Sequence, residues 1–201
     1  MSEDRVRIGI EGLDQMMGGG LIPGSICAII GTYGTGKTTF ALEFIWEGLK
    51  QGDHVIYISL EEREDRLIRY MTEKGWDIVP YSGKAFSVLK LDPSDFNLAI
   101  NSIKNELPAL VKQVGAQRVV IDPISLFEDL FDRDSDRRRE MFRFVDTLRD
   151  QHCTIVMTSE TDKDNPFASR HNLIEYLADT VILLRYVRPS DLTDVHLALE
   201  V

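Results

Sequence analysis

The sequence predicts an α/β fold in which a mostly parallel central β-sheet is flanked by helices, because two kinds of apolar segment alternate along its 201 residues. Short β-branched runs are apolar at both odd and even positions, which is typical of strands that are buried on both faces of a parallel sheet. Longer segments between these runs carry apolar residues at helical spacing. We therefore expect strands and helices to alternate along the chain.

The short runs predict strands at Ser25–Ile30, His54–Ser59, Phe86–Leu91, Arg118–Ile121, Thr154–Ser159 and Thr180–Leu184, followed by a β-like run at His196–Val201. The longer segments predict helices at Thr38–Leu49, Arg63–Lys74, Phe96–Val114 and Asp136–Gln151. Pro108 is expected to break or restart the third helix, because proline lacks the N–H that a helix interior needs. Since no linker or internal repeat divides the sequence, we expect one domain over residues 1–201.

Composition narrows the possible classes of protein. Hydrophobic residues make up 43% and charged residues 28%, which is ordinary for a globular domain. The formal net charge of -10 argues against a nucleic acid as the partner, because nucleic-acid binding proteins usually present a basic surface. No apolar stretch approaches the roughly 18 residues of a membrane span, and the N-terminus does not resemble a signal peptide. We therefore expect a soluble, cytoplasmic protein without a membrane partner.

The segment Gly31-Thr-Tyr-Gly-Thr-Gly-Lys-Thr38 matches the phosphate-loop pattern GxxxxGK[ST] at every fixed position. It lies between a predicted strand and a predicted helix, as a phosphate loop does. The alternative, an ordinary glycine-rich turn that matches the pattern by chance, has no reason to occur between these two elements. The glycines allow the backbone N–H groups to curl inward, and the helix adds its positive N-terminal end. We expect Lys37 to reach the β- and γ-phosphates of a nucleotide and the Thr38 hydroxyl to bind Mg²⁺. The predicted nucleotide-binding residues are Gly31, Thr32, Tyr33, Gly34, Thr35, Gly36, Lys37, Thr38 and Thr39.

Acidic residues follow two of the predicted strands. Asp122 ends an apolar strand and is predicted to hold the metal together with Thr38. Glu61 and Glu62 follow His54–Ser59, where a carboxylate could orient or deprotonate the attacking water. The alternative is a solvated acidic helix start, which would suit both glutamates equally well. Spacing alone does not decide which of the two is the better base.

A polar group, Thr158-Ser159-Glu160, ends another predicted strand. Because ligands of such sheets bind at the carboxyl ends of the strands, Ser159 and Glu160 are candidate sensors of the γ-phosphate. Such a sensor could transmit the state of the nucleotide to the loop Thr161–His171. The alternative is an ordinary strand end with polar residues.

The chain resembles the KaiC-like ATPases of the RecA superfamily over essentially its whole length. The resemblance is carried by the stretches Ile8–Asp14 and Gly18–Ser25 before the phosphate loop, the loop itself, the pair Glu61-Glu62, Gly75-Trp76, Asp122, Thr158–Glu160 and the late segment Leu173–Leu184. It implies a RecA-type core that binds ATP or ADP with Mg²⁺, with Glu61 and Glu62 as the catalytic carboxylates. It also implies a ring, expected to be a hexamer, with ATP at the subunit interfaces.

Two departures from the family affect the prediction. KaiC itself carries two such domains and this chain carries one, so a clock role is not implied. In the family, a basic segment after the last strand reaches the neighbour's ATP site, but this sequence ends at Glu200-Val201, where that segment would begin. We therefore expect that a C-terminal segment is missing and that hydrolysis is slow without it.

The resulting functional hypothesis is a Mg²⁺-dependent ATPase whose nucleotide state controls ring assembly or contact with an unknown protein partner, in a regulatory or signalling role. A non-hydrolysing ATP-dependent switch is the alternative from another class of protein. A RecA-like DNA-binding ATPase is disfavoured by the acidic charge. An autokinase that modifies Ser125 or Ser135 is the last possibility, although nothing in the sequence marks either serine as an acceptor.

Overall fold

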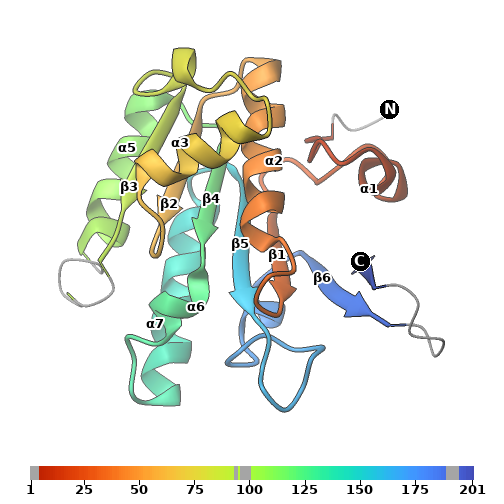
Figure 1. Cartoon of the computed structure of the whole chain (residues 1–201). Helices are drawn as coiled ribbons and strands as arrows, with labels where there is room; N and C mark the ends of the chain where they lie inside the picture. Colours follow the sequence, from red (N-terminus) through yellow and green to blue (C-terminus); the bar gives the residue numbers. More distant parts are fainter. Residues whose placement is uncertain (1–4, 93–94, 96–100, 189–194) are drawn as a thin grey trace.

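The computed structural model describes residues 5–92, 95, 101–188 and 195–201 and arranges them around a seven-stranded sheet with the order β3-β2-β4-β5-β1-β6-β7 (Figure 1). Neighbouring strands are parallel except for β6 and β7, which are antiparallel. The strands are β1 (Ile26–Gly31), β2 (Val55–Ser59), β3 (Phe86–Lys90), β4 (Arg118–Asp122), β5 (Thr154–Glu160), β6 (Thr180–Val187) and β7 (His196–Glu200). The predicted mostly parallel α/β fold is confirmed, with small shifts at the strand ends.

The helices of the described residues are α1 (Glu11–Met16), α2 (Lys37–Gln51), α3 (Glu64–Glu73), α5 (Leu107–Val114), α6 (Ile124–Glu128) and α7 (Asp134–Arg149). Three of the predicted helices correspond to α2, α3 and α7. The predicted helix Phe96–Val114 is confirmed only in part, because residues 96–100 lie outside the described residues. A π-helical turn (Ser102–Glu106) leads into α5, and Pro108 lies in the first turn of that helix, where the missing N–H costs nothing.

Two short helices, α1 and α6, were not predicted. Each is only five or six residues long, which is too short for helical periodicity to show in the sequence. Two 3₁₀ turns, Val79–Tyr81 and Ile174–Tyr176, were missed for the same reason. No helix among the described residues is long and apolar enough to cross a membrane.

Apolar side chains on the two faces of the sheet form two separate cores. Along β1, Ile26, Ala28 and Ile30 join the core that also contains side chains of α5, α6 and α7. Cys27 and Ile29 join the other core, which contains side chains of α2 and α3. Every residue of β1, β2 and β4 is buried, because helices cover both faces. This explains why these strands are apolar at both parities.

Parallel pairing brings the carboxyl ends of the central strands to one edge of the sheet. Gly31 of β1 lies opposite Glu160 of β5, and Ser59 of β2 lies opposite Asp122 of β4. The phosphate loop and the predicted acidic residues therefore meet at this edge, which is where ligands of such sheets bind.

Arg118 supports the opposite end of the sheet and was not singled out by the sequence. Its side chain is only 1% exposed, and its guanidinium contacts an acid at 2.6 Å. The groups that accept its hydrogen bonds are the Asp53 carboxylate, the Gln51 side chain and the carbonyl oxygens of Arg7 and Phe44. One buried cation thus joins β4 to α2 and to the N-terminal segment, and its four acceptors offset the cost of burying the charge.

Glu128, at the end of α6, has a buried carboxyl group that lacks a hydrogen-bond partner among the described residues. It is fully buried, and neither carboxyl oxygen is hydrogen-bonded within the described part of the chain. Burial raises the pKa of Glu128 from 4.5 to about 8. Glu175 and Asp129 raise it further, whereas Arg137 and Arg170 act in the opposite direction. The folded chain therefore keeps this group protonated at neutral pH.

This shifted pKa predicts that stability falls as pH rises. The unfolded carboxyl titrates near 4.5 and the folded one near 8, so the folded state holds an extra proton between these values. The stabilisation is complete below the lower value and is lost as pH rises through the upper one. We expect the free energy of unfolding of Glu128→Gln to exceed that of the unaltered chain by about 3–4 kcal/mol more at pH 8 than at pH 5.

Urea unfolding of both proteins at several pH values measures this difference. Glutamine has the shape of glutamate but no charge to bury, so its stability should change less across the window. If the two proteins lose stability in parallel, Glu128 does not titrate as its burial implies.

Candidate nucleotide-binding site

The phosphate loop joins β1 to α2 and folds back over the end of its own strand. Gly34 and Gly36 have φ angles of 79° and 89°, which side chains other than glycine rarely adopt. Gly31 is needed for a different reason, because a Cβ there would lie 2.5 Å from Thr35 Oγ1 and 2.9 Å from the Leu184 carbonyl oxygen. The predicted glycine positions therefore serve the loop by two means, a left-handed backbone at two of them and close packing at the third.

Lys37 begins α2 and places its ammonium group under the loop. Its Nζ donates hydrogen bonds to the carbonyl oxygens of Gly31 at 2.8 Å and Thr32 at 3.0 Å. Partial burial lowers the pKa of Lys37, while the carboxylates of Glu160, Asp122 and Glu61 oppose this shift. The carboxylates of these three acids therefore act on the ammonium group.

The Asp122 carboxylate is the point where three hydroxyl groups meet. Thr38 Oγ1 donates to Asp122 Oδ2 at 2.9 Å, and Tyr57 Oη donates to the same oxygen at 2.5 Å. Thr158 Oγ1 donates to the other oxygen, Oδ1. Burial, followed by the nearby Asp122 carboxylate, raises the pKa of Tyr57 well above 10, so its hydroxyl remains a donor. The two predicted metal ligands, Thr38 and Asp122, thus lie within hydrogen-bonding distance of each other.

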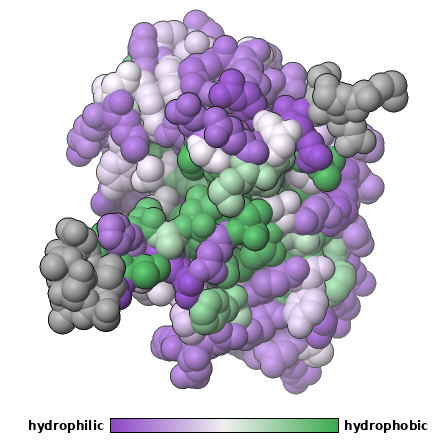
Figure 2. All heavy atoms as spheres, turned by 90° about the vertical axis from the view of Figure 1, so that its right-hand side faces the viewer, coloured by the Kyte–Doolittle hydropathy of each residue, from purple (hydrophilic) through white to green (hydrophobic). Residues whose placement is uncertain are grey.

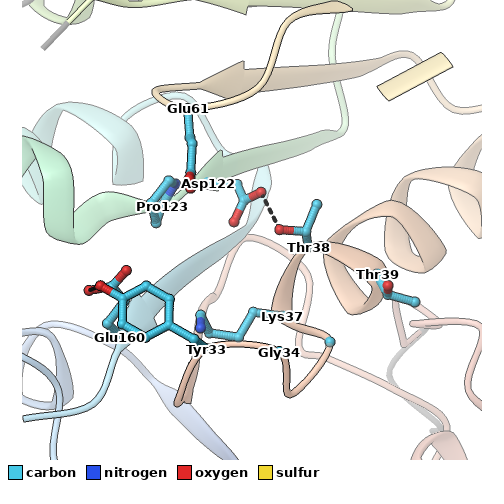
Figure 3. Close-up of a pocket in the computed structure, with 10 residues that line it drawn as sticks. Tyr33, Gly34, Lys37, Thr38, Thr39, Glu61, Asp122, Pro123 and Glu160 are labelled. Atoms are coloured by element: carbon cyan, nitrogen blue, oxygen red, sulfur yellow. Dashed lines mark hydrogen bonds between the residues drawn. The ribbon is translucent and has the colours of Figure 1, made fainter. Parts of the chain in front are cut away.

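The two adjacent glutamates point in different directions. Glu61 lines the pocket and extends toward Pro123 and Asp122 (Figure 3). The Glu62 carboxylate instead forms an ion pair with Arg66 of α3, with 3.2 Å between Oε2 and Nη1. The Glu62 carbonyl oxygen accepts a hydrogen bond from Ser59 Oγ at 2.5 Å, which fixes the backbone between them. The structure therefore distinguishes the positions of Glu61 and Glu62, which the spacing of residues in the sequence could not do.

Glu160, at the end of β5, lies on the side of the pocket next to the phosphate loop (Figure 3). Its Oε2 accepts hydrogen bonds from Tyr33 Oη at 2.9 Å and from Arg170 Nη1 at 3.0 Å. Ser159 is fully buried, and its Oγ donates to the Glu160 carbonyl oxygen at 3.2 Å. Of the two candidate sensors, only Glu160 reaches the pocket.

These side chains enclose a pocket of about 320 Å³, lined by Tyr33, Gly34, Gly36, Lys37, Thr38, Thr39, Glu61, Asp122, Pro123 and Glu160. Three of its lining residues are carboxylates, while a single lysine supplies positive charge. A triphosphate would enter this pocket only with additional positive charge. The donor set fits Mg²⁺, because the Thr38 hydroxyl keeps its oxygen lone pairs for a metal while its hydrogen is bonded to Asp122.

A second pocket, of about 320 Å³, adjoins the first and shares Gly36 and Thr39 with it. Its walls are mostly apolar and come from α2, β6, β7 and the segment before α1. Figure 2 shows hydrophobic surface gathered on this side of the molecule. The remaining lining residues are Ile10, Thr35, Phe40, Glu43, Leu184, Leu197 and Leu199. An apolar cavity beside a phosphate loop suits a flat, largely apolar group attached to a phosphate chain.

Sequence reasoning missed Tyr57 and Arg170 and gave Tyr33 no role beyond the loop. Tyr57 had a usable signal, because a tyrosine inside a strand buried on both faces needs a hydrogen-bond partner for its hydroxyl. The contacts of Tyr33 and Arg170 with Glu160 left no signal in the sequence. They form because two loops fold back against the end of β5. Tyr186 Oη also donates to the Gly34 carbonyl oxygen at 2.6 Å, which ties β6 to the phosphate loop.

The sheet and the loop together define a P-loop nucleotide-binding domain, and comparison with known proteins makes this class specific. The family model described as the KaiC ATPase matches residues 6–201. The chain belongs to the KaiC ATPase family, so the predicted resemblance and its RecA-type core are confirmed. Membership of an ATPase family implies that nucleotide binding is the basic property of the domain.

Curated relatives include the circadian clock oscillator protein KaiC of Parathermosynechococcus lividus, which is 32% identical over 188 residues. The protein of the same name from Synechococcus elongatus is 30% identical over 191 residues. The alignments cover 89% and 91% of this chain but only 35% and 37% of those relatives, so the chain spans little more than a third of their length. A crystal structure of a KaiC-like protein from Pyrococcus horikoshii OT3 superposes with a TM-score of 0.84 at 27% identity, covering 98% of this chain and 86% of that one.

Proposed function

We propose that this chain binds ATP with Mg²⁺ and hydrolyses it, and that its nucleotide state controls ring assembly or contact with a protein partner in a regulatory role. One observation carries this proposal: Lys37, the bonded pair Thr38 and Asp122, and Glu61 converge on the same pocket. This constellation supplies a phosphate cradle, a metal site and a carboxylate for the attacking water. Family membership supports the same activity.

The residues of the loop and of Asp122 have distinct tasks in this proposal. The loop N–H groups and the N-terminal end of α2 bind the phosphates, and the Lys37 ammonium pairs with the β- and γ-phosphate oxygens. To do so, Lys37 exchanges its bonds to the Gly31 and Thr32 carbonyl oxygens for phosphate oxygens. Thr38 and Asp122 would hold Mg²⁺, which neutralises phosphate charge when bound.

Glu61 is the proposed base, because its carboxylate faces the pocket whereas that of Glu62 is paired with Arg66. From the strand end beside Asp122 it can accept the proton of a water that attacks the γ-phosphate. Glu62 instead stabilises the first turn of α3. Of the two catalytic carboxylates that the family resemblance implies, only one fits this task.

The apolar second pocket is the proposed site of the adenine base. It begins at Gly36 and Thr39, so a nucleotide with its phosphates in the loop can extend into it. Leu197 and Leu199 of β7 form one wall and Phe40 of α2 lies in another. Stacking and burial of the base there would add affinity that does not depend on the phosphates.

Glu160 is the proposed sensor of the γ-phosphate, and Ser159 contributes only by holding the Glu160 backbone. The contacts of Glu160 lead away from the pocket, since Arg170 also pairs with Asp129, with 3.1 Å between Nη2 and Oδ2. Asp129 in turn contacts His171 Nε2 at 2.7 Å. A phosphate that alters the Tyr33–Glu160–Arg170 contacts would therefore reach the loop Thr161–His171.

The proposed ring places the nucleotide between subunits, and the charge of the pocket supports this arrangement. Three carboxylates against one ammonium leave the lining negative, so a cation from a neighbouring subunit would favour both ATP binding and phosphoryl transfer. A hexamer is the proposed size, as the family resemblance implies. A cytoplasmic location belongs to the same proposal.

Removing the metal is expected to abolish both activity and assembly. With Mg²⁺ and ATP the chain should release phosphate and increase in mass by light scattering, and excess EDTA should reverse both effects. ADP with Mg²⁺ is the matched control for the γ-phosphate. Phosphate release that is equal with and without EDTA would contradict the metal-dependent mechanism. Tight ATP binding without turnover under any condition would favour the non-hydrolysing switch.

An autokinase and a DNA-binding ATPase both fit the chain less well than a Mg²⁺-dependent ATPase does. Ser125 is fully buried, so it is a poor acceptor for a phosphoryl group. Ser135 is exposed in the first turn of α7 and does not line the pocket. The formal net charge of -10 opposes binding to DNA.

A further inference from the structure

The Asp122 carboxylate has more hydrogen-bond donors than are needed to hold it in place. An ionised carboxylate offers about four acceptor sites, two on each oxygen. Thr38 and Tyr57 occupy both sites of Oδ2, at 2.9 Å and 2.5 Å. Thr158 occupies one site of Oδ1. Within the part of the chain that the structure describes, one acceptor site, on Oδ1, is left for a ligand in the pocket.

The hydroxyls of Tyr57 and Thr158 come from the two strands that flank β4. Both residues are fully buried, and Asp122 itself is only 5% exposed. Tyr57 is paired with Val120 in the sheet, two residues before Asp122 and on the same face of β4. The carboxylate is therefore clamped from both neighbouring strands by side chains that packing prevents from turning away.

This clamp limits how Asp122 can contact a metal ion. A hydrated ion needs a single acceptor site for one of its bound waters, and the free site on Oδ1 provides it. An ion that binds the carboxylate in bidentate fashion needs a lone pair from each oxygen, and both sites of Oδ2 are already taken. Mg²⁺ gives up its water reluctantly, whereas Ca²⁺ takes six to eight oxygen ligands and readily accepts bidentate carboxylates.

We infer that Tyr57 is a specificity-determining residue for the divalent cation: by occupying Oδ2 of Asp122 together with Thr38, its hydroxyl prevents bidentate coordination by this carboxylate and so favours Mg²⁺ over Ca²⁺ in the nucleotide complex. The inference rests on the proposed function, because the cation concerned is the one that accompanies ATP. It assigns Tyr57 a role in metal choice that is separate from its contribution to the core.

Tyr57→Phe tests the inference, because it removes only the hydroxyl. The probe is a fluorescent, non-hydrolysable ATP analogue, titrated with Mg²⁺, with Ca²⁺ and with EDTA. In the variant the affinity ratio of the Mg²⁺ to the Ca²⁺ complex should fall about tenfold, which corresponds to one hydrogen bond to a charged group. The fall should come from tighter binding with Ca²⁺, and the affinity in EDTA should stay within about twofold.

Tyr81→Phe is the matched control, because it removes a tyrosine hydroxyl from the cluster around Trp46, where the two rings are 6.1 Å apart. Its ratio should equal that of the unaltered chain. Thr158→Val is a second control, since it frees a site on Oδ1 while Oδ2 stays occupied, and its ratio should not change. If circular dichroism shows that Tyr57→Phe does not fold, a crystal structure of the unaltered chain with Ca²⁺ and the analogue decides the question, because Asp122 should contact the ion through no more than one oxygen.

An unchanged ratio in a folded Tyr57→Phe protein, or bidentate coordination of Ca²⁺ by Asp122 in the unaltered chain where that variant does not fold, would overturn the inference and leave the proposed function intact. If the unaltered chain binds the analogue no better with Mg²⁺ than with EDTA, both fail together.

Discussion

A Lys37→Ala protein is expected to bind ATP at least about 100-fold more weakly than the unaltered chain, a loss of about 3 kcal/mol. Lys37 supplies the positive charge of a pocket that also contains the carboxylates of Glu61, Asp122 and Glu160. Without its ammonium group, the phosphates would meet three negative charges with only Mg²⁺ and the loop N–H groups to offset them. Equilibrium titration of a fluorescent ATP analogue with Mg²⁺ measures the loss.

Lys112→Ala is the control for this substitution, because Lys112 is an exposed lysine on α5. The two variants remove the same charge from the chain, so a general electrostatic effect would lower both affinities. Unchanged ATP affinity in a folded Lys37→Ala protein would show that the loop is not the phosphate site, and the proposed activity would fall with it.

Glu61→Gln is expected to slow phosphate release about 100- to 1000-fold while ATP affinity changes little. Glutamine keeps the size of the side chain but cannot accept the proton of the attacking water. The loss corresponds to about 3–4 kcal/mol of the activation barrier. Single-turnover hydrolysis of ATP with excess protein measures the chemical step separately from nucleotide binding.

Glu62→Gln is the control for Glu61→Gln, because it makes the same chemical change one residue along the chain. It tests whether the loss of rate depends on where the carboxylate lies. Its carboxylate pairs with Arg66, a partly exposed ion pair whose loss costs little. We expect its rate to stay within about threefold of the unaltered chain, which is under 1 kcal/mol of barrier. The assignment is wrong if Glu62→Gln shows the larger loss, or if the two variants are equally fast.

Features encoded by neighbouring residues were predictable from the sequence. The phosphate loop is contiguous, so its glycines, Lys37 and Thr38 could be recognised together. The strands could be recognised because burial on both faces demands apolar residues at every position. Asp122 followed from a strand that ends in an acid, and the parallel sheet then required it to lie at the same edge as the loop.

Features that depend on the pairing register of the strands, or on where a loop packs against the sheet, were not predictable from the sequence. Tyr57 meets Asp122 because β2 and β4 pair with Ser59 opposite Asp122, and nothing in a single sequence fixes that register. Glu61 and Glu62 differ because α3 begins at Glu64, which places Arg66 beside only one of them. Arg118 resembles any other strand residue in the sequence, because its acceptors lie more than 60 positions away.

A crystal structure with Mg²⁺ and a non-hydrolysable ATP analogue tests the central claim most directly. The account predicts the γ-phosphate within hydrogen-bonding distance of Lys37 Nζ, the ion on Thr38 Oγ1 with a water between it and Asp122, and Glu61 facing the γ-phosphate. The adenine should lie between Phe40 and Leu197. A triphosphate bound elsewhere, or Glu61 turned away while Glu62 faces the phosphate, would contradict it.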